Sequence, residues 1–556
     1  MTATIGTGTL PPVGYHVEQF TPEETAILER FFTNTTEPVF GLVNLPEVVK
    51  GALFARYSRS PKSVRRLFLD EFYDAPDVGV AAIAERIEGD DHMVNMQRAE
   101  DLYSRVFTQY GDDSVAQLGG VHLACEQASN ILTKVLEWGR LAAYLEQSTR
   151  YMFYDKRLGD RYRYVVPPEV AASPGAGAYE STMEHLFDLY AGLTGRLTAY
   201  YQSLFPQADG DSDFVYRSTI RARVCDDLRG LLPAATLSNV GIYGTGQAYE
   251  MLLLRMRANP LAEVRQVADR MLVELRKLIP AFLVRVDLPD RGDAWSRYLA
   301  ETADGMRRIA GDFAAPVPVR PEVTLVEWDP DADVKVAAAA LYAHTDLPDD
   351  HLLEAARRMT DEERRRVIAA YVGERGNRRH KPGRAMERVA YRFDILCDYG
   401  IFRDLQRHRM MTLEWQRLGT LHGYALPDSI ADIGAEQPWR AAMDRAAALH
   451  DDLVAAHGPD VAQYAVPFAY RIRFYMDMNA REAFHMLELR TAQGGHPDYR
   501  RVCQEMHRLI RDQAGHTAIA GAMRFVDHDD YGLGRLATER RAAAKRAAAG
   551  VADPED

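Results

Sequence analysis

The feature that most constrains this chain is a long internal duplication. The segment RVAYRFDILCDYGIFRDLQRHR, which ends at Arg409, aligns with VHLACEQASNILTKVLEWGR, which ends at Arg140. A second pair of segments aligns through Pro467 and Pro233. The offset between the copies is 269 residues at the first pair and 234 at the second, so the second copy has a shorter middle loop. Repeats of this length are duplicated domains, because the units of solenoid proteins run to about 20 to 50 residues.

The length of 556 residues agrees with two large domains, since one ordinary domain is shorter. The segments DLPDRGDAW and FAAPVPVRPE are rich in Pro, Asp and Gly, which is typical of a linker between domains. We therefore predict a flexible arm over 1–20, a first domain over 21–285, a linker over 286–320, a second domain over 321–534 and a helical or disordered tail over 535–556.

Three local patterns predict helices. Thr21 followed by Pro22 and Glu24 is typical of a capped helix start. Apolar residues recur at intervals of three and four over 112–141, which predicts a long, mostly buried helix. The apolar residues of DILCDYGIFRDLQ predict a second buried helix directly before Arg407.

Composition excludes several classes of protein. A hydrophobic content of 47% with 26% charged residues is typical of a globular protein with a substantial core. The net charge of -13 and the pI near 5.7 argue against a nucleic-acid partner, because proteins that follow phosphate backbones usually carry a basic surplus. No apolar run is long enough to cross a membrane and no leader pattern is present, so we expect a cytoplasmic protein without a membrane partner.

The cysteines and glycines do not indicate a metal or nucleotide motif. Cys125, Cys225, Cys397 and Cys503 are far apart and form no CxxC pair, so we predict buried thiols and no metal site. The chain has no GxGxxG or P-loop pattern. Any phosphate-bearing ligand would therefore be held by side chains.

Arg407, His408 and Arg409 form the densest group of donors in the chain. Such a group suits the oxygens of a phosphate or pyrophosphate, where charge-assisted bonds are strong. An isolated triplet would more often be a solvated surface patch. The duplication favours a binding site, because the first copy carries Trp138 and Gly139 at the first two aligned positions.

A second polar group lies near the end of the corresponding segment in the first copy. In an extended segment Glu146, Ser148 and Arg150 would point to one face, which could bind a small ligand with donors and acceptors. A salt bridge between Glu146 and Arg150 on a surface strand is an equally acceptable interpretation. Ser148 has no histidine near it in sequence that could activate its hydroxyl, so we interpret it as a hydrogen-bonding group.

These segments resemble the flavin-dependent thymidylate synthase family, whose signature is RHRxxSxNExSxR followed by an NxR and a LxLR segment. RHRMMT, EQSTRY, RFYMDMNAR and HMLELR carry the resemblance, which covers about 40–285 and 320–530. The resemblance implies an α+β (mixed α/β) fold, here a tandem pair of domains forming a pseudo-dimer. It also implies the reductive methylation of dUMP to dTMP, with methylenetetrahydrofolate as carbon donor, FAD as hydride carrier and NADPH as reductant.

Neither copy keeps the whole signature, and the losses are largely complementary, so we expect one site shared between the two copies. The resemblance implies that Arg490 is catalytic and stabilises charge on the substrate ring. It implies two further sets of ligands. Substrate-binding residues would be Glu146, Ser148, Arg150, Arg473 and Arg490, and FAD-binding residues would be Arg407, His408, Arg409, Asn479, Arg481, His485 and, less directly, Ser58.

Partners and alternatives follow from the same resemblance. Family members assemble as homotetramers, so two of these duplicated chains are expected to form a homodimer of pseudo-dimers. Two other functions remain open, because a fold does not fix its substrate. One is a flavoenzyme acting on another pyrimidine nucleotide, and the other is a non-catalytic paralogue that binds flavin or nucleotide.

Overall fold

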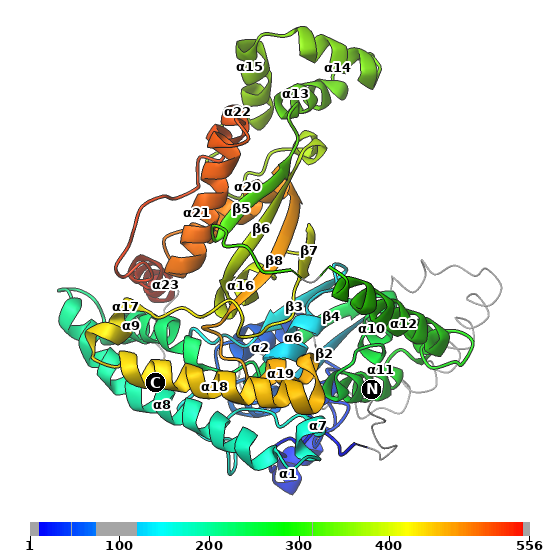
Figure 1. Ribbon diagram of the computed structural model, residues 1–556, viewed down its shortest axis with the longest axis vertical. Helices are drawn as coiled ribbons and strands as arrows, with labels where there is room; N and C mark the ends of the chain where they lie inside the picture. The colour runs from blue at the N-terminus through cyan, green and yellow to red at the C-terminus, as the bar shows by residue number, and fades with distance from the viewer. Residues whose placement is uncertain (1–9, 46, 74–118, 314, 549–556) are drawn as a thin grey trace. The chain divides into compact units, whose positions relative to one another are not determined.

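The structure is a computed structural model that describes residues 10–45, 47–73, 119–313 and 315–548. It contains two four-stranded antiparallel sheets, one from each half of the sequence, with helices packed around them (Figure 1). This confirms the predicted α+β fold. No helix in the described ranges combines the length and the apolar character needed to cross a membrane.

The two sheets have the same strand order, which confirms the tandem duplication at the level of topology. Across the sheet the first runs β1-β2-β4-β3 and the second runs β5-β6-β8-β7. The strands of the first sheet are β1 (Val39–Gly41), β2 (Gly120–Ser129), β3 (Ala142–Glu146) and β4 (Leu237–Thr245). Those of the second are β5 (Val323–Trp328), β6 (Ala390–Asp398), β7 (Thr412–Trp415) and β8 (Arg471–Asn479).

Each central strand turns into a helix without an intervening loop. The last residue of the strand is the N-cap of the helix, and its side chain accepts a hydrogen bond from a backbone N–H three residues later. The four corners are Ser129 before α6 (Asn130–Leu136), Thr245 before α10 (Gly246–Arg257), Asp398 before α16 (Tyr399–Leu405) and Asn479 before α20 (Ala480–Arg490).

The chain forms two compact units, and neither is a continuous stretch of sequence. Unit 1 consists of the described residues within 1–194, 231–316 and 437–467, and unit 2 of those within 195–230, 317–436 and 468–556. Besides the elements above, unit 1 contains α1 (Pro22–Leu28), α2 (Glu47–Tyr57), α3 (Val64–Leu67), the π-helix η1 (Phe68–Tyr73), α7 (Pro168–Ala171), the first part of α8 (Ala176–Leu204), α11 (Ala262–Arg276), the short helix η4 (Pro280–Leu283), α12 (Gly292–Gly311), nearly all of α18 (Glu436–His457), α19 (Pro459–Ala462) and η6 (Gln463–Ala465).

Unit 2 is built around the second sheet. Its further helices are the end of α8, α9 (Asp213–Leu228), most of η3 (Arg229–Leu231), α13 (Ala332–Tyr342), α14 (Asp349–Arg358), α15 (Asp361–Val372), η5 (Arg384–Arg388), α17 (Asp428–Asp432), α21 (Pro497–Asp512), α22 (Thr517–Ala522) and α23 (Leu536–Ala548). Helix α23 shows that most of the predicted tail is helical. Each unit therefore takes at least one helix from the other half of the sequence.

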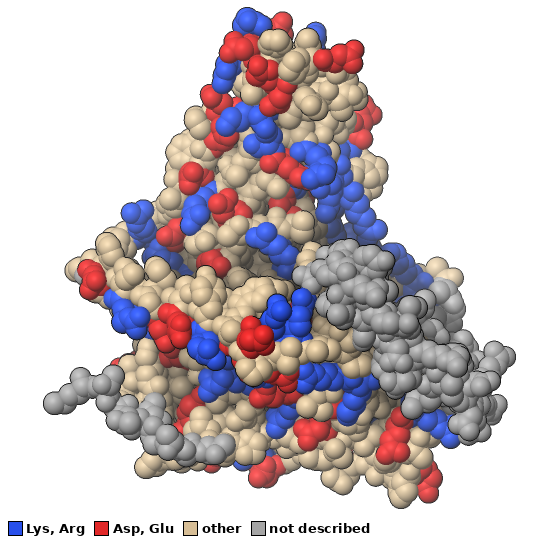
Figure 2. All heavy atoms as spheres, turned by 90° about the vertical axis from the view of Figure 1, so that its right-hand side faces the viewer, with Lys and Arg blue, Asp and Glu red and all other residues tan. Residues whose placement is uncertain are grey.

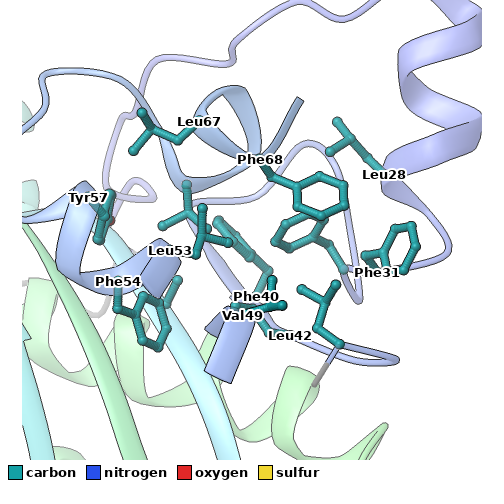
Figure 3. Close-up of a cluster of buried hydrophobic side chains, with 14 residues drawn as sticks. Leu28, Phe31, Phe40, Leu42, Val49, Leu53, Phe54, Tyr57, Leu67 and Phe68 are labelled. Atoms are coloured by element: carbon teal, nitrogen blue, oxygen red, sulfur yellow. The ribbon is translucent and has the colours of Figure 1, made fainter. Parts of the chain in front are cut away.

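Unit 1 has an aromatic core between its N-terminal helices and the first sheet. Phe31, Phe40 and Phe68 are fully buried in this cluster, together with Leu53 (Figure 3). The rings of Phe31 and Phe68 lie 5.0 Å apart between centroids. The predicted helix start is confirmed, because Thr21 and Glu24 form a capping box that begins α1. All four cysteines are buried, as predicted.

Residues 437–467 are tied to first-half elements of unit 1 by main-chain and side-chain bonds. Tyr464 Oη donates to Glu263 Oε2 at 2.6 Å, and the backbone N–H of Ala235 donates to the carbonyl of Tyr464 at 3.0 Å. Pro233 and Pro467, the aligned prolines of the two copies, form a β-bridge. Helix α18 lies beside α8 in Figure 1, where Arg445 donates to the backbone carbonyl of Ser181.

Two of the predicted helices were wrong in part. The described portion of 112–141 contains strand β2 before helix α6, and the segment before Arg407 contains the end of β6 before α16. Ile395 therefore lies in a strand, whereas Ile401 and Leu405 lie in a helix. Strand β2 is buried along most of its length, and such a run has no periodicity that separates it from a buried helix. Strand β6 does alternate, with Tyr391, Phe393, Ile395 and Cys397 buried, so the period of two was present in the sequence.

The predicted linker is not an irregular segment. Helix α12 occupies most of 286–320, and its N-terminal end packs in unit 1, where Arg257 forms a salt bridge with Asp293 at 3.2 Å. Figure 2 shows acidic and basic side chains interspersed over the face of the molecule that it draws. Such a mixture is typical of a solvated surface.

A fragment that ends at Pro316 should not fold independently. Unit 1 would lack α18, whose Trp439, Met443 and Leu453 are buried. Burial of these three side chains corresponds to about 5–9 kcal/mol, which is comparable to the whole stability of a domain. We expect residues 1–316 to show no cooperative thermal transition, measured by circular dichroism, and co-expression with 317–556 to restore one. A cooperative transition of the isolated fragment would contradict the division into these two units.

Candidate functional site

The strongest candidate site lies in unit 2, where two helices meet above the second sheet. The strands β6 and β8 pair antiparallel, with Asp398 opposite Arg471 and Ala390 opposite Asn479. Helices α16 and α20 therefore start at opposite ends of the sheet and run back toward each other. Their C-terminal ends come into contact, since Arg490 Nη2 donates to the backbone carbonyl of Asp404 at 2.6 Å. A cation is favourable there, because helix C-termini carry partial negative charge.

A chain of three side chains forms the centre of this site. Arg490 Nε lies 2.8 Å from His408 Nε2, and His408 Nδ1 lies 3.3 Å from Glu482 Oε1. His408 and Glu482 are buried, whereas Arg490 is half-buried. The Arg490 guanidinium also lies over the ring of Tyr499 at 5.3 Å from the centroid. Arg490, which the resemblance singles out, is thus held on three sides.

The contacts of His408 fix its tautomer. A guanidinium can only donate, so Nε2 must be the acceptor and the proton must be on Nδ1. Nδ1 then donates to the carboxylate of Glu482. Glu482 is not among the site residues that the sequence indicated. It lies one residue after Arg481 and three before His485, so it was within the singled-out segment and could have been found as the carboxylate on the His485 side of the helix.

Burial shifts the pKa values of Glu482 and His408. It raises the pKa of Glu482 to about 7, although Lys381 and Arg481 act in the opposite direction. Burial and the positive charge of Arg490 hold the pKa of His408 well below its ordinary value. The imidazole therefore stays neutral at neutral pH, as its role as acceptor for Arg490 requires.

Three of these atoms are close enough to be considered as metal ligands. One ligand atom each of His408, Glu482 and His485 lie within 4.8 Å of one another. A metal on Nδ1 would force the proton onto Nε2, which faces the donor of Arg490. The positive charges of Lys381 and Arg490 also oppose a divalent cation here. The group is built as a hydrogen-bonded chain and suits an anionic ligand better.

The residues of the Arg-His-Arg triplet point in different directions. Arg407 is exposed, Arg409 is half-buried and His408 is buried. His408 points into the protein, because both its nitrogens are bonded there. The triplet follows α16 directly, and alternate burial is what an irregular, extended segment produces.

The other second-copy residues surround α20. Asn479 uses its side-chain oxygen to cap the helix, accepting from the N–H of Glu482 at 2.9 Å. Arg481 donates to Glu387 at 3.1 Å and to the carbonyl of Pro382 at 3.0 Å. His485 is half-buried, and its ring centroid lies 5.5 Å from that of His408.

Arg473 lies elsewhere on the second sheet. It is in the middle of β8 and forms a salt bridge with Asp394 of β6 at 2.9 Å. Its backbone carbonyl accepts from Gln416 N at 2.9 Å. The described contacts of Arg473 do not include the three-residue chain, so the structure does not gather it with Arg490 by direct contact.

The first-copy residues lie together in unit 1. The backbone N–H of Ser148 donates to the carbonyl of Ser58 at 3.0 Å, and the side chain of Ser148 accepts from Arg150 N at 3.2 Å. Glu146 ends β3 and is buried, with Lys134 Nζ at 3.2 Å. The alternative of a salt bridge on a surface strand is wrong in its exposure, because Glu146 is buried. Arg150 is itself buried.

In the first copy, other side chains occupy the space beside the residue that aligns with His408. Gly139 stands where the second copy has His408, and an added Cβ would lie 2.7 Å from Tyr144 Oη and 3.7 Å from Arg255 Nη2. Arg255 instead lies over the Trp138 ring at 4.7 Å. The first copy therefore keeps an arginine near the end of its helix but replaces its imidazole support with stacked rings.

The described part of unit 2 also contains a pocket of about 540 Å³ lined by residues of α8, α9 and α21. Its walls carry eight carboxylate residues and three arginines, the former including Asp398 and Asp498. Burial raises the pKa of Asp398 to about 7. An excess of carboxylates repels phosphates, so this pocket is a poor candidate for a nucleotide.

Comparison with known proteins identifies relatives of the whole chain. The model of the family described as thymidylate synthase complementing protein matches residues 70–281 and 324–514. A UPF0159 protein of Chlamydia pneumoniae is 38% identical over 530 residues, which cover 94% of this chain and 98% of that protein. A UPF0159 protein of Thermoplasma acidophilum is 30% identical, covering 88% and 98%.

Two further similarities cover part of the chain. A flavin-dependent thymidylate synthase of Clostridium tetani is 25% identical over 181 residues, 32% of this chain and 67% of that protein. Among solved structures, a UMP/dUMP methylase from Streptomyces cacaoi bound with 5-Br dUMP is 18% identical. It covers 37% of this chain and 97% of that one, with a TM-score of 0.28.

Replacement of Glu482 by glutamine should change how stability depends on pH. A carboxyl whose pKa is higher in the folded than in the unfolded state destabilises the fold as pH rises, here between about 4.3 and about 7. We expect the wild-type protein to lose about 2–3 kcal/mol over this range through Glu482, and Glu482→Gln to lack that loss. Urea unfolding at about pH 5 and about pH 7.5 measures the difference.

The control is Glu354→Gln on α14, where the carboxylate is exposed. It should leave the pH dependence unchanged. The lowered pKa of His408 gives an opposite slope, but it is present in all three proteins and cancels to first order. Equal pH dependence in wild type and Glu482→Gln would refute the assignment of a raised pKa to this residue.

Proposed function

The chain belongs to the family of thymidylate synthase complementing proteins, and on that premise we propose that it methylates dUMP reductively to dTMP. FAD is the proposed hydride carrier, methylenetetrahydrofolate the carbon donor and NADPH the reductant. The observation that carries the proposal is the chain from Glu482 through His408 to Arg490, which holds one guanidinium in a fixed direction.

The proposed role of Arg490 follows from the chemistry of the base. C5 of uracil reacts as a nucleophile only when negative charge develops on the ring, and a preorganised cation near the carbonyls stabilises that charge. Arg490 has five N–H donors, of which Nε and one on Nη2 are used in the contacts described. The remaining donors can bond a carbonyl oxygen of the base without reorganising the helix ends.

The proposed role of His408 and Glu482 is to position Arg490. A neutral imidazole accepts from Nε without adding positive charge, and Glu482 holds the ring by its Nδ1–H. These residues restrict the rotamers of Arg490, and restricted rotamers are what a preorganised site needs. His408 is thus proposed as a support of the catalytic arginine, in addition to the flavin contact that the resemblance implies.

The cations around α20 suit an anionic dinucleotide. Arg407 is exposed, and Arg481 and His485 are half-buried, so each can reach a ligand. Lys381 and Arg378 add positive charge close to His485, whose pKa burial and these charges lower to about 4. FAD, when bound, supplies hydride transfer, while these side chains hold its phosphates and orient it.

First-copy residues are proposed to contribute to the same activity. Ser58, Glu146, Ser148 and Arg150 are retained there, and hydrogen bonds join Ser148 to Ser58 and to Arg150. By the same resemblance, Arg150 and Arg473 are each proposed to bind a nucleotide phosphate. A homodimer of these chains, acting on nucleotide and folate in the cytoplasm, is the corresponding assembly.

Activity should depend on Arg490 and not on its first-copy counterpart. In an anaerobic assay with NADPH, methylenetetrahydrofolate and FAD, release of the C5 hydrogen of dUMP reports turnover. Arg490→Ala should lower kcat/KM by a factor that corresponds to about 2–5 kcal/mol of activation free energy, because the ligand charge is left unpaired. Arg255→Ala, checked for folding by circular dichroism, should retain most activity, since Arg255 is engaged with Trp138.

The same assay separates the alternatives. Turnover of another pyrimidine nucleotide but not of dUMP would indicate a related flavoenzyme. Flavin binding without C5-hydrogen release from any pyrimidine nucleotide would indicate a binding paralogue. Equal loss of activity in Arg490→Ala and Arg255→Ala would contradict the different roles proposed for the two copies.

Flavin retention should depend on Arg407. Its side chain is exposed at the end of α16, so removing it should leave the fold intact and weaken FAD binding by about tenfold, or about 1.4 kcal/mol. The difference from the wild type should shrink at high salt, because salt screens the ionic contact that only the wild type makes. Flavin absorbance after gel filtration measures the effect. Arg417→Ala removes an exposed arginine just after β7 and should retain normal flavin content.

A further inference from the structure

Helix α12 presents an apolar stripe to solvent. Trp295, Tyr298, Met306, Ile309 and Phe313 are 44 to 79% exposed, although each is a large hydrophobic residue. Their spacing of three, eight, three and four residues places them within one face of the helix. The helix continues in helical geometry through its C-cap, whose φ and ψ are -72° and -16°. The stripe is about 27 Å long at 1.5 Å per residue.

A stripe of this kind is unusual on a surface helix. The first turns of α12 are anchored in unit 1 by the buried hydroxyl of Ser296, which donates to the carbonyl of Leu254 at 3.1 Å. From residue 301 onward every residue of α12 except Gly305 is exposed, so this half projects into solvent in the described structure. Large exposed apolar residues near both ends of one helix face, with Thr302 and Gly305 between them, mark an interaction site.

Charged residues follow one edge of the stripe in a self-complementary order. Glu301 and Arg308 are seven residues apart and therefore lie almost one above the other. Arg297 and Asp312 lie near the same edge, further toward the two ends. When two helices of this sequence pair antiparallel, residues on the same edge face each other across the pair. Glu301 of one helix then faces Arg308 of the other, and Arg297 faces Asp312.

The register of the pairing is the same for both sets. In an antiparallel pair of identical helices, the residue numbers of facing residues add up to a constant. That constant is 609 for Glu301 opposite Arg308 and also for Arg297 opposite Asp312, so one alignment of the helices forms both pairs. The midpoint is between residues 304 and 305, where Gly305 has no side chain to hold the backbones apart. Trp295 and Phe313 have the sum 608, so the largest apolar residues meet at each end of the pair.

We propose that α12 is a self-association surface, on which the α12 helices of two copies of this chain pair antiparallel about a two-fold axis near Gly305. The two-fold symmetry makes each favourable pair occur twice, which is the usual property of a dimer interface between identical chains. The inference concerns assembly and does not depend on the proposed function.

A charge exchange tests the pairing in the full-length protein. Sedimentation equilibrium over a range of concentrations gives the dimer dissociation constant. Glu301→Arg and Arg308→Glu should each weaken the dimer by about tenfold, because each places like charges opposite each other twice. The double variant restores opposite charges across the pair and should restore the dissociation constant. Such rescue is expected only when α12 pairs with a second α12 in this register.

Two further variants complete the test. Ile309→Asp in the stripe should abolish the dimer, whereas Arg307→Glu makes the same charge change as Arg308→Glu on the opposite face and should have little effect. Circular dichroism checks that each variant is folded. A wild-type protein that is monomeric at all concentrations, or single variants that leave its dimerisation unchanged, would overturn the proposal. So would failure of the double variant to restore it.

Discussion

The antiparallel pairing of two central strands, each of which turns directly into a capped helix, is the constraint on which the rest of this structure depends. The cap at Asp398 begins α16 and the cap at Asn479 begins α20 from opposite ends of one strand pair. Because no loop intervenes, the strand register also fixes where the helices end. A substituted cap costs about 1 kcal/mol, and at these corners it would also loosen the support of Arg490.

The two copies show how one scaffold can keep or lose a site. In the second copy, an imidazole and a carboxylate hold Arg490 near the helix ends. In the first copy Gly139 takes the place of His408, so there is no imidazole. Tyr144 and Trp138 lie beside Arg255 instead. The fold tolerates both solutions, since the strand order and the capped corners are the same. Loss of the second-copy interactions from the first copy is therefore a local change in side chains.

The exchange of helices between the halves ties the duplication into one molecule. Unit 1 includes α18 from the second half, and unit 2 includes α9 from the first. In unit 2, Ser429 donates to Asp227 of α9 at 2.6 Å, as Tyr464 does to Glu263 in unit 1. Each of these buried carboxylates also accepts from a second hydroxyl, of Tyr201 at Asp227 and of Ser129 at Glu263, so these bonds belong to small buried networks that join residues of both halves. The halves thus depend on each other more than a linear division into domains implies.

The sequence by itself determined the duplication, the α+β class, the family and the helix start at Thr21, because alignment and capping depend on residues close in sequence. The helix predicted before Arg407 was wrong in part, because Ile395 and Leu396 were grouped with the apolar residues of α16 although β6 alternates between buried and half-buried residues. Only the tertiary structure decided that His408 points inward and that Glu482 holds it. Those contacts join residues 74 and 82 positions apart, and no local pattern specifies which side chains will meet when two helices converge.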